Sequence, residues 1–363
     1  MKLPFKILIV LLVLPALVFA NENPKFKGKY TKTKTINKEY TVNAEAALLV
    51  VNRYGNIDII TWNENRTVIE VVITTNGNNE EMVQKKLDDI NVEFSWTASK
   101  VIAKTIIKGK KGSSWSLWGK NKNNVSMEIN YTIKLPVTNS VDLSNDYGAI
   151  SINNLDGHAR ISCDYGQVII GALNADNNYL DFDYTQNSTI GYMKSGKINA
   201  DYSGFVLKKT ERLELNADYT GSEITEVADL NYNSDYGKIK VGKAVKINGR
   251  GDYTPLTVGT LSGAMNINTD YGSVTVDRIT STAGDITIRS DYAGIHLGYD
   301  SDYHFDFTID LLHTSLKGKE DLEILNTSKD HSNKFYSGYY GSKNSGNTIN
   351  IKSNYGRVSL DKN

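Results

Sequence analysis

The chain has 363 residues, with 41 basic and 41 acidic side chains and a formal net charge of +0. This balance argues against a nucleic-acid-binding protein, which usually carries a basic surface. The single cysteine, Cys163, excludes an intramolecular disulfide, so a buried core must hold the fold, and the chain is long enough to form one. The 22 tyrosines and 29 glycines, with only 5 prolines, favour many short strands and turns.

Residues 1–20 have the features of a signal peptide. Lys2 and Lys6 precede an apolar run that ends in Val18 and Ala20, which suit the −3 and −1 positions of a cleavage site. The run is short for a membrane anchor, and no later stretch of the sequence is apolar enough to span a bilayer. We therefore expect an exported protein, located in the periplasm, at the cell surface or in the medium.

Residues 21–140 are irregular. We expect a polar, extended lead-in over residues 21–45 and a first repeat-like unit over residues 46–60, which opens an N-terminal region reaching to residue 140. Residues 79–90 predict a short helix, because Asn79 suits the N-cap and Met82, Val83, Leu87 and Ile90 are apolar. This helix would cover an end of the fold. Residues 91–107 and 125–137 are predicted to pair as a hairpin.

Residues 141–298 repeat an Asp-Tyr dipeptide, usually with a Gly one or two positions later, at intervals of 17 to 21 residues. A Tyr-Gly dipeptide also occurs near each end of the repeats, at Tyr54 and Tyr355. The repeated tyrosines are Tyr147, Tyr165, Tyr184, Tyr202, Tyr219, Tyr236, Tyr253, Tyr271 and Tyr292. A fixed period of this length is typical of a protein built by stacking one structural unit.

The apolar residues of each repeat keep fixed offsets from its tyrosine. They lie six and four positions before it, as Val141 and Leu143 do, and three and five positions after it, as Ile150 and Ile152 do. We interpret each repeat as one rung of a parallel β-solenoid, all-β and about eighteen residues per rung, and the crossover rule favours a right-handed β-helix. An antiparallel sandwich would not return the same residue types at fixed offsets.

The strand alternation leads us to expect the tyrosine rings inside the corner of each rung, stacked in a ladder above a small residue two positions earlier. Cys163 occupies that small position and is expected to be a buried filler. The following Gly is expected to supply unusual backbone angles at the corner.

The aspartates before the tyrosines would form a column, one carboxylate per rung. They are Asp146, Asp164, Asp183, Asp201, Asp218, Asp235, Asp252, Asp270 and Asp291. In one interpretation each carboxylate accepts backbone N–H groups at the corner. In the other, Ca²⁺ lies between rungs, but six or more oxygen ligands are hard to supply from one carboxylate per rung. We expect no cofactor or metal, with calcium as the alternative.

Two segments outside the repeats are candidates for binding. The loop at residues 108–124 contains Trp115 and Trp118 among basic residues, including Lys110, Lys111 and Lys120, and has no acid. Exposed aromatic and basic side chains can bind a glycan, a protein or a lipid surface, whereas in the alternative both tryptophans fold back on a hairpin. Residues 299–363 are expected to form a long excursion from one rung, followed by a final rung.

The sequence shows no catalytic motif. Its histidines lack metal-ligand spacing, and it has no nucleophile elbow, phosphate-binding loop or dinucleotide fingerprint. We expect a non-enzymatic protein that binds a glycan or a cell-surface protein. The alternatives are a polysaccharide-active β-helix enzyme, which requires paired carboxylates that break the repeat, and a structural envelope component without a ligand.

A family resemblance covers residues 45–360. The segments "LVVNRYGNIDI" and "YTIKLPVTNSVDLSNDYGAISI", followed by repeated G-x-I-x-I strands, resemble the family of bacterial β-solenoid proteins known as "putative adhesins", which is related to auto-transporter adhesin heads. The resemblance implies the architecture and a role in binding at a surface, and it carries no catalytic residues. The regular Asp-Tyr dipeptide departs from the usual repeat of that family.

Overall fold

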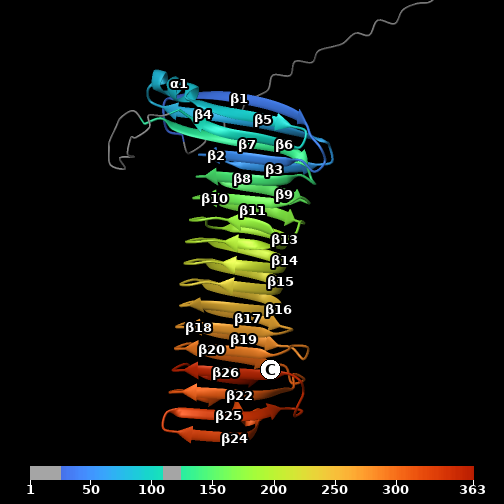
Figure 1. The fold of residues 1–363 in the computed structure, drawn as a ribbon. Coiled ribbons are helices and arrows are strands. Elements are labelled where there is room, and N and C mark those ends of the chain that lie inside the picture. Colours follow the sequence, from blue (N-terminus) through green and yellow to red (C-terminus); the bar gives the residue numbers. More distant parts are fainter. Residues whose placement is uncertain (1–25, 109–123) are drawn as a thin grey trace, which may run out of the picture.

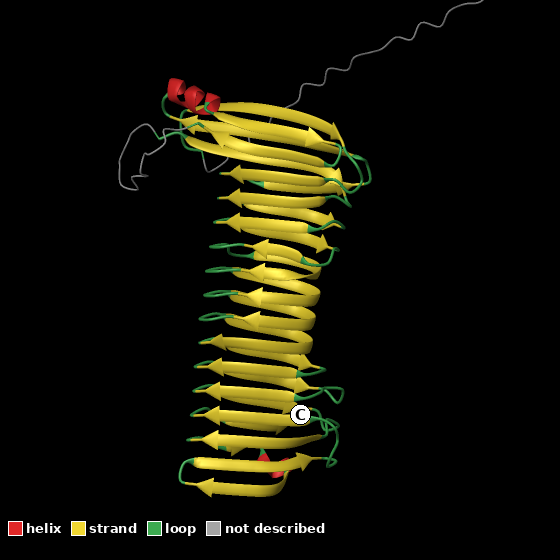
Figure 2. Ribbon diagram, viewed as in Figure 1, coloured by secondary structure: helices red, strands yellow, loops and turns green. Residues whose placement is uncertain are grey.

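The computed structural model describes residues 26–108 and 124–363, so the predicted signal peptide lies outside the described residues. The fold is all-β, as predicted, with 67% strand and 4% helix in a sheet that does not close on itself. Figures 1 and 2 show the strands stacked one above another in a long column. Within the described residues, no helix has the length and apolar character needed to cross a membrane.

The middle of the column contains the regular repeats. Its strands are β8 (Ser140–Asp146), β9 (Ala149–Leu155), β10 (Ala159–Asp164), β11 (Gln167–Leu173), β12 (Asn178–Asp181), β13 (Ser188–Asn199), β14 (Gly204–Asn216), β15 (Gly221–Asn233), β16 (Lys238–Asp252), β17 (Pro255–Leu261), β18 (Met265–Asp270), β19 (Ser273–Ile279), β20 (Ile286–Asp291) and β21 (Gly294–Tyr299). Each strand pairs in parallel with the strand one repeat later, as β8 does with β10 and β9 with β11. Equivalent positions of successive repeats therefore lie opposite one another.

This register builds the core from the apolar positions that the sequence pattern singled out. Leu143 lies opposite Ile161 on one row of strands, and Ile150 lies opposite Val168 on the next. All four side chains are completely buried. The same stacking of equivalent apolar positions continues along the column, so each repeat covers the apolar surface of its neighbours.

The N-terminal end contains β1 (Tyr30–Thr41), β2 (Ala47–Arg53), β3 (Ile57–Trp62), β4 (Arg66–Gly77), α1 (Glu80–Asp88), β5 (Ile90–Thr97), β6 (Lys100–Ile107) and β7 (Ser126–Pro136). Two rows of strands extend the column here. One runs from β2 through β6 to β5, and the other runs from β3 through β7 and β4 to β1. The lead-in predicted as extended thus becomes the edge strand β1.

The hairpin predicted between residues 91–107 and 125–137 is wrong. The strands β5 and β6 form a hairpin with each other, whereas β7 pairs with β3 and β4 in the other row. The predicted helix is confirmed as α1, and the Asn79 side chain accepts the Met82 N–H at 3.0 Å. Its buried Val83 and Leu87 face the fold, and α1 contacts β4, β1 and β5 at this end (Figure 1).

The C-terminal end contains β22 (Phe305–Leu312), β23 (Leu316–Lys317), the 3₁₀ helix η1 (Lys319–Asp321), β24 (Glu323–Asp330), β25 (Asn333–Tyr340), β26 (Thr348–Asn354) and β27 (Val358–Lys362). The last repeat in the sequence is not the last in space, because β26 lies between β20 and β22 (Figure 1). The excursion passes beyond it, and the antiparallel strands β25 and β24 finish the column.

Candidate functional site

The corner of each repeat is formed by its tyrosine, which adopts a left-handed backbone conformation. Eleven tyrosines from Tyr54 to Tyr355 share this geometry, with φ between 51° and 63°. Their rings point outward. From Tyr147 to Tyr355 the ten side chains are 40% to 53% exposed, and Tyr54 is partly buried. The prediction that the rings lie inside the corner is therefore wrong, because a left-handed residue interrupts the alternation of a strand.

The rings stack in one continuous row along the column. Neighbouring ring centroids are 4.7 to 5.3 Å apart, and the ring planes differ by 1° to 11°. His313 continues the row in the next layer, with a φ of 55° and a ring 4.6 Å from that of Tyr355. We call the eleven tyrosines and His313 the tyrosine ladder. The predicted stacking is confirmed, but it lies on the surface.

The backbone of the corner is satisfied by hydrogen bonds to neighbouring repeats. The N–H of each ladder tyrosine donates to a carbonyl in the next layer, as Tyr219 does to Asp235 at 3.0 Å. Carboxylates of the aspartate column accept the N–H of the aspartate one layer on. Asp218 does so from Asp235 at 2.8 Å, and four other pairs repeat the bond. The carboxylate therefore bonds the adjacent layer, where the sequence had predicted bonds within the corner itself.

The glycine after the tyrosine has a different role from the one predicted. Its φ is not positive. Glycine is needed here because the layer before it lies so close that a side chain would clash with its backbone. A Cβ on Gly166 would lie 2.0 Å from the carbonyl oxygen of Gly148. At Ser203, Thr220 and Thr254, which occupy this position in other repeats, the hydroxyl donates to a carbonyl of the earlier layer, as Thr220 does to Ala200 at 2.7 Å.

Two carboxylates of the aspartate column have raised pKa values. Partial burial raises the pKa of Asp183, and the neighbouring carboxylates Asp201 and Asp181 raise it further. Burial likewise raises the pKa of Asp164, with Asp183 and Asp146 adding to the effect. Across the described residues, no group of three or more His, Cys, Asp or Glu side chains is placed to hold a metal ion.

A shallow hollow of about 450 Å³ lies among the residues that follow Tyr184, Tyr202, Tyr219 and Tyr236 along the chain. Gly204 and Gly221 line it, with Gln186 and Lys238 in the layers on either side. A Cβ on Gly221 would meet nothing within 4 Å. At Gly221, the second residue after its tyrosine, the surface is therefore open. By contrast, the first residue after a ladder tyrosine, such as Gly166, packs tightly against the layer before it.

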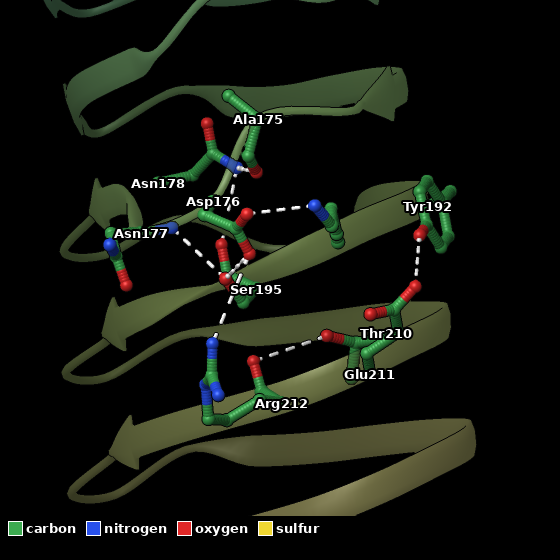
Figure 3. Close-up of polar contacts among 10 residues, drawn as sticks. Ala175, Asp176, Asn177, Asn178, Tyr192, Ser195, Thr210, Glu211 and Arg212 are labelled. Carbon is green, nitrogen blue, oxygen red and sulfur yellow. Dashed lines mark hydrogen bonds and ion pairs between the residues drawn. The ribbon is translucent and has the colours of Figure 1, made fainter.

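The bend around Asp176 brings charged side chains of neighbouring layers together (Figure 3). Its carboxylate accepts hydrogen bonds from Lys194 at 2.7 Å and Ser195 at 2.9 Å, and Arg212 lies 3.9 Å away. These contacts, led by Lys194, lower the pKa of Asp176. An ionised, salt-bridged carboxylate is a poor general acid.

The predicted binding residues of the loop lie outside the described residues; they are Trp115, Trp118, Lys110, Lys111 and Lys120. Cys163 is fully buried, and burial raises its thiol pKa to about 12. The sequence did hold a signal for the outward rings. The residue after the tyrosine is small and the apolar positions resume at an odd offset, so the inward positions resume one residue after the tyrosine.

No family model matches the chain, and no curated protein matches it. Its solved neighbours include a "putative cell adhesion protein" from Clostridium sporogenes, 13% identical over 92% of this chain and 100% of that one, with a TM-score of 0.20. "Putative adhesins" from Bacteroides fragilis and Parabacteroides distasonis are 12% and 10% identical, each covering 91% of this chain and 97% of theirs, with TM-scores of 0.23 and 0.30. At such low values these likenesses carry no argument for the function of this chain.

Proposed function

We propose that this chain is an exported, non-enzymatic β-solenoid, right-handed with rungs of about eighteen residues, that binds a partner at a surface through its tyrosine ladder. The signal-like residues 1–20 support export, and the parallel register of successive repeats supports the solenoid. The exposed, repeated tyrosines support the binding role.

The observation that carries this proposal is the residue type at the corner. A left-handed backbone costs an ordinary side chain roughly 1–2 kcal/mol, whereas Gly avoids the cost and Asn reduces it. Tyrosine occupies this conformation eleven times. Stacking offsets part of the strain, but the fold alone would be served by Asn. Strain kept at repeated, exposed positions is typical of a functional surface.

The geometry of the ladder limits what it can bind. Each ring face is covered by the ring of the next layer, so ring edges and hydroxyl groups face outward. A sugar ring that packs on an aromatic face would therefore find no free face along the row. The ladder favours a protein partner, and the loop with Trp115 and Trp118 is the candidate for a glycan.

Attachment of purified protein to bacterial cell surfaces and to glycan arrays tests this proposal. We expect Tyr202→Asn/Tyr219→Asn/Tyr236→Asn to reduce cell attachment at least tenfold. Trp115→Ala/Trp118→Ala is expected to weaken glycan binding with little change in melting temperature. A matched control is Val245→Thr/Leu325→Thr, which removes apolar side chains of similar exposure away from the ladder. Attachment that survives in the tyrosine variant would contradict the role of the ladder.

A further inference from the structure

We infer that the partner of the tyrosine ladder is a second copy of this chain, paired ladder to ladder with the two long axes parallel. This inference rests on the proposed function of the ladder as a contact surface and identifies its occupant. Self-association would make adhesion homophilic, so that one exported copy binds another.

The exposed area of the ladder is large enough for a stable dimer. A tyrosine side chain buries about 150–250 Å², so a half-exposed ring leaves roughly 100 Å² open. Ten rings are 40% to 53% exposed, which gives on the order of 1,000 Å² of ladder per copy. A standard interface buries about 800 Å² per partner, and the largest apolar patch on a monomer is typically about 300–600 Å².

The period of the ladder is what singles out a second copy. Its rings recur every 4.7 to 5.3 Å along the column. A partner that meets every ring in the same way needs the same period, and another copy has it by construction. Two ladders aligned without an offset bury the most rings, and each shift by one layer loses a contact. The repeat therefore sets the register.

The contact is made by ring edges. Aromatic atoms pack about 3.5–4.0 Å apart, so the gap between neighbouring rings has no room for a ring of the partner. Each phenol hydroxyl can donate one hydrogen bond and accept others. Two facing rows of hydroxyls therefore pair across the interface layer by layer, flanked by the apolar ring edges.

The aspartate column decides the orientation. All repeats run in the same direction, so the aspartates lie on one side of the ladder, and the residues that follow the corner, including Lys238 and Arg357, lie on the other. A two-fold axis along the column keeps the two aspartate columns on opposite sides of the interface. An antiparallel pair would bring them together, and like charges at close range repel.

Sedimentation equilibrium of the purified protein tests the pairing. We expect a dimer at low micromolar concentration and at least tenfold weaker association for Tyr202→Asn/Tyr219→Asn/Tyr236→Asn. The control Val245→Thr/Leu325→Thr should associate like the parent, and circular dichroism checks that each variant is folded. A parent protein that stays monomeric up to 100-fold higher concentration would overturn the inference.

Disulfide trapping tests the orientation independently. In the parallel pair Tyr147 faces its own equivalent, so Tyr147→Cys should form a covalent dimer by itself under oxidising conditions. The native Cys163 is buried and serves as the unreactive background. In an antiparallel pair Tyr147 would face Tyr292, and only a mixture of Tyr147→Cys and Tyr292→Cys would cross-link across the two. That second result would overturn the parallel arrangement.

The two proposals fail separately. A monomer that still attaches to surfaces in a ladder-dependent way would contradict self-pairing and leave the proposed function standing with another partner. A monomer whose attachment is unchanged in the tyrosine variant would contradict both. A ladder-dependent dimer supports the inference whether or not glycans or other cells also bind.

Discussion

Two bends of the same column solve the same backbone problem with different residues. At the bend around Asp176, the left-handed residue is Asn177, a short polar side chain that tolerates this conformation, and the groups nearby bond one another (Figure 3). At the corner, the left-handed residue is tyrosine, and its ring touches chiefly other rings. The first bend uses a residue that tolerates the left-handed conformation. The second places a residue there for which the conformation is strained, and its rings are exposed.

The largest expected effect comes from the packed inner side of the corner. Gly166→Ala would place a Cβ 2.0 Å from the carbonyl oxygen of Gly148, so the layers must move apart. We expect the free energy of unfolding to fall by about 1–3 kcal/mol. Gly221→Ala is the matched control on the open outer side, where a Cβ meets nothing within 4 Å, and it should stabilise by about 0.5–1 kcal/mol. Urea unfolding measures both, and equal losses would contradict the difference between the two sides.

A smaller effect is expected from the ring itself. Tyr236 stacks between Tyr219 and Tyr253, with centroids 5.1 and 4.8 Å away. Tyr236→Asn loses both stacks but relieves the left-handed backbone, so we expect the free energy of unfolding to change by less than about 1 kcal/mol. Urea unfolding also measures this change. A loss of several kcal/mol would show that the ladder is mainly a stabilising device, and it would remove the argument for a binding role.

A still smaller effect on Tm is expected when an aspartate of either bend is replaced by Asn, and the change should have opposite signs at Asp183 and Asp176. Burial raises the pKa of Asp183, so ionising it costs more in the folded state, and stability falls as the pH rises from about 4 through the raised value. Asp183→Asn removes this cost and should raise Tm at pH 7 by about a degree. The gain should disappear below about pH 4.

Asp176→Asn is expected to do the opposite. Its pKa is lowered because Lys194 and Ser195 bond the ionised form, so the stability it contributes is present at pH 7 and is lost as the pH falls through the lowered value. Differential scanning fluorimetry of both variants across this range provides the comparison. If the two variants shift Tm in the same direction at pH 7, the contrast between the bends is wrong.

The smallest expected effect concerns calcium. In five layers one carboxylate oxygen of the column already accepts a backbone N–H of the next layer, which leaves few free oxygens for an ion that needs six or more. We expect the same Tm with excess calcium and with chelator. A rise of several degrees with calcium would show that the native state binds ions, and it would favour the aspartate column as the site.

The sequence predicted the repeating part of the fold well because its signals are local. Apolar residues at fixed offsets from the tyrosine, such as Leu143 and Ile150, mark the inward positions of each strand, and identical spacing in every repeat places them opposite one another. The helix at Asn79 was likewise readable from its cap and its apolar positions. The ends were not predictable in this way, because the row that β7 joins depends on which strand edges remain open after β2 pairs with β8 and β3 pairs with β9.

By itself, the sequence determined the period, the buried positions and the fact that the tyrosines stack. Only the tertiary structure decided that the ladder faces solvent, because the direction of the rings depends on a single backbone angle at each corner. A positive φ at the tyrosine reverses which side it faces. The odd offset of the apolar positions after the tyrosine agrees with that reversal, but the backbone angle itself is fixed only when the layers are stacked. The layers approach closely next to this corner, where a Cβ on Gly166 would lie 2.0 Å from the carbonyl oxygen of Gly148.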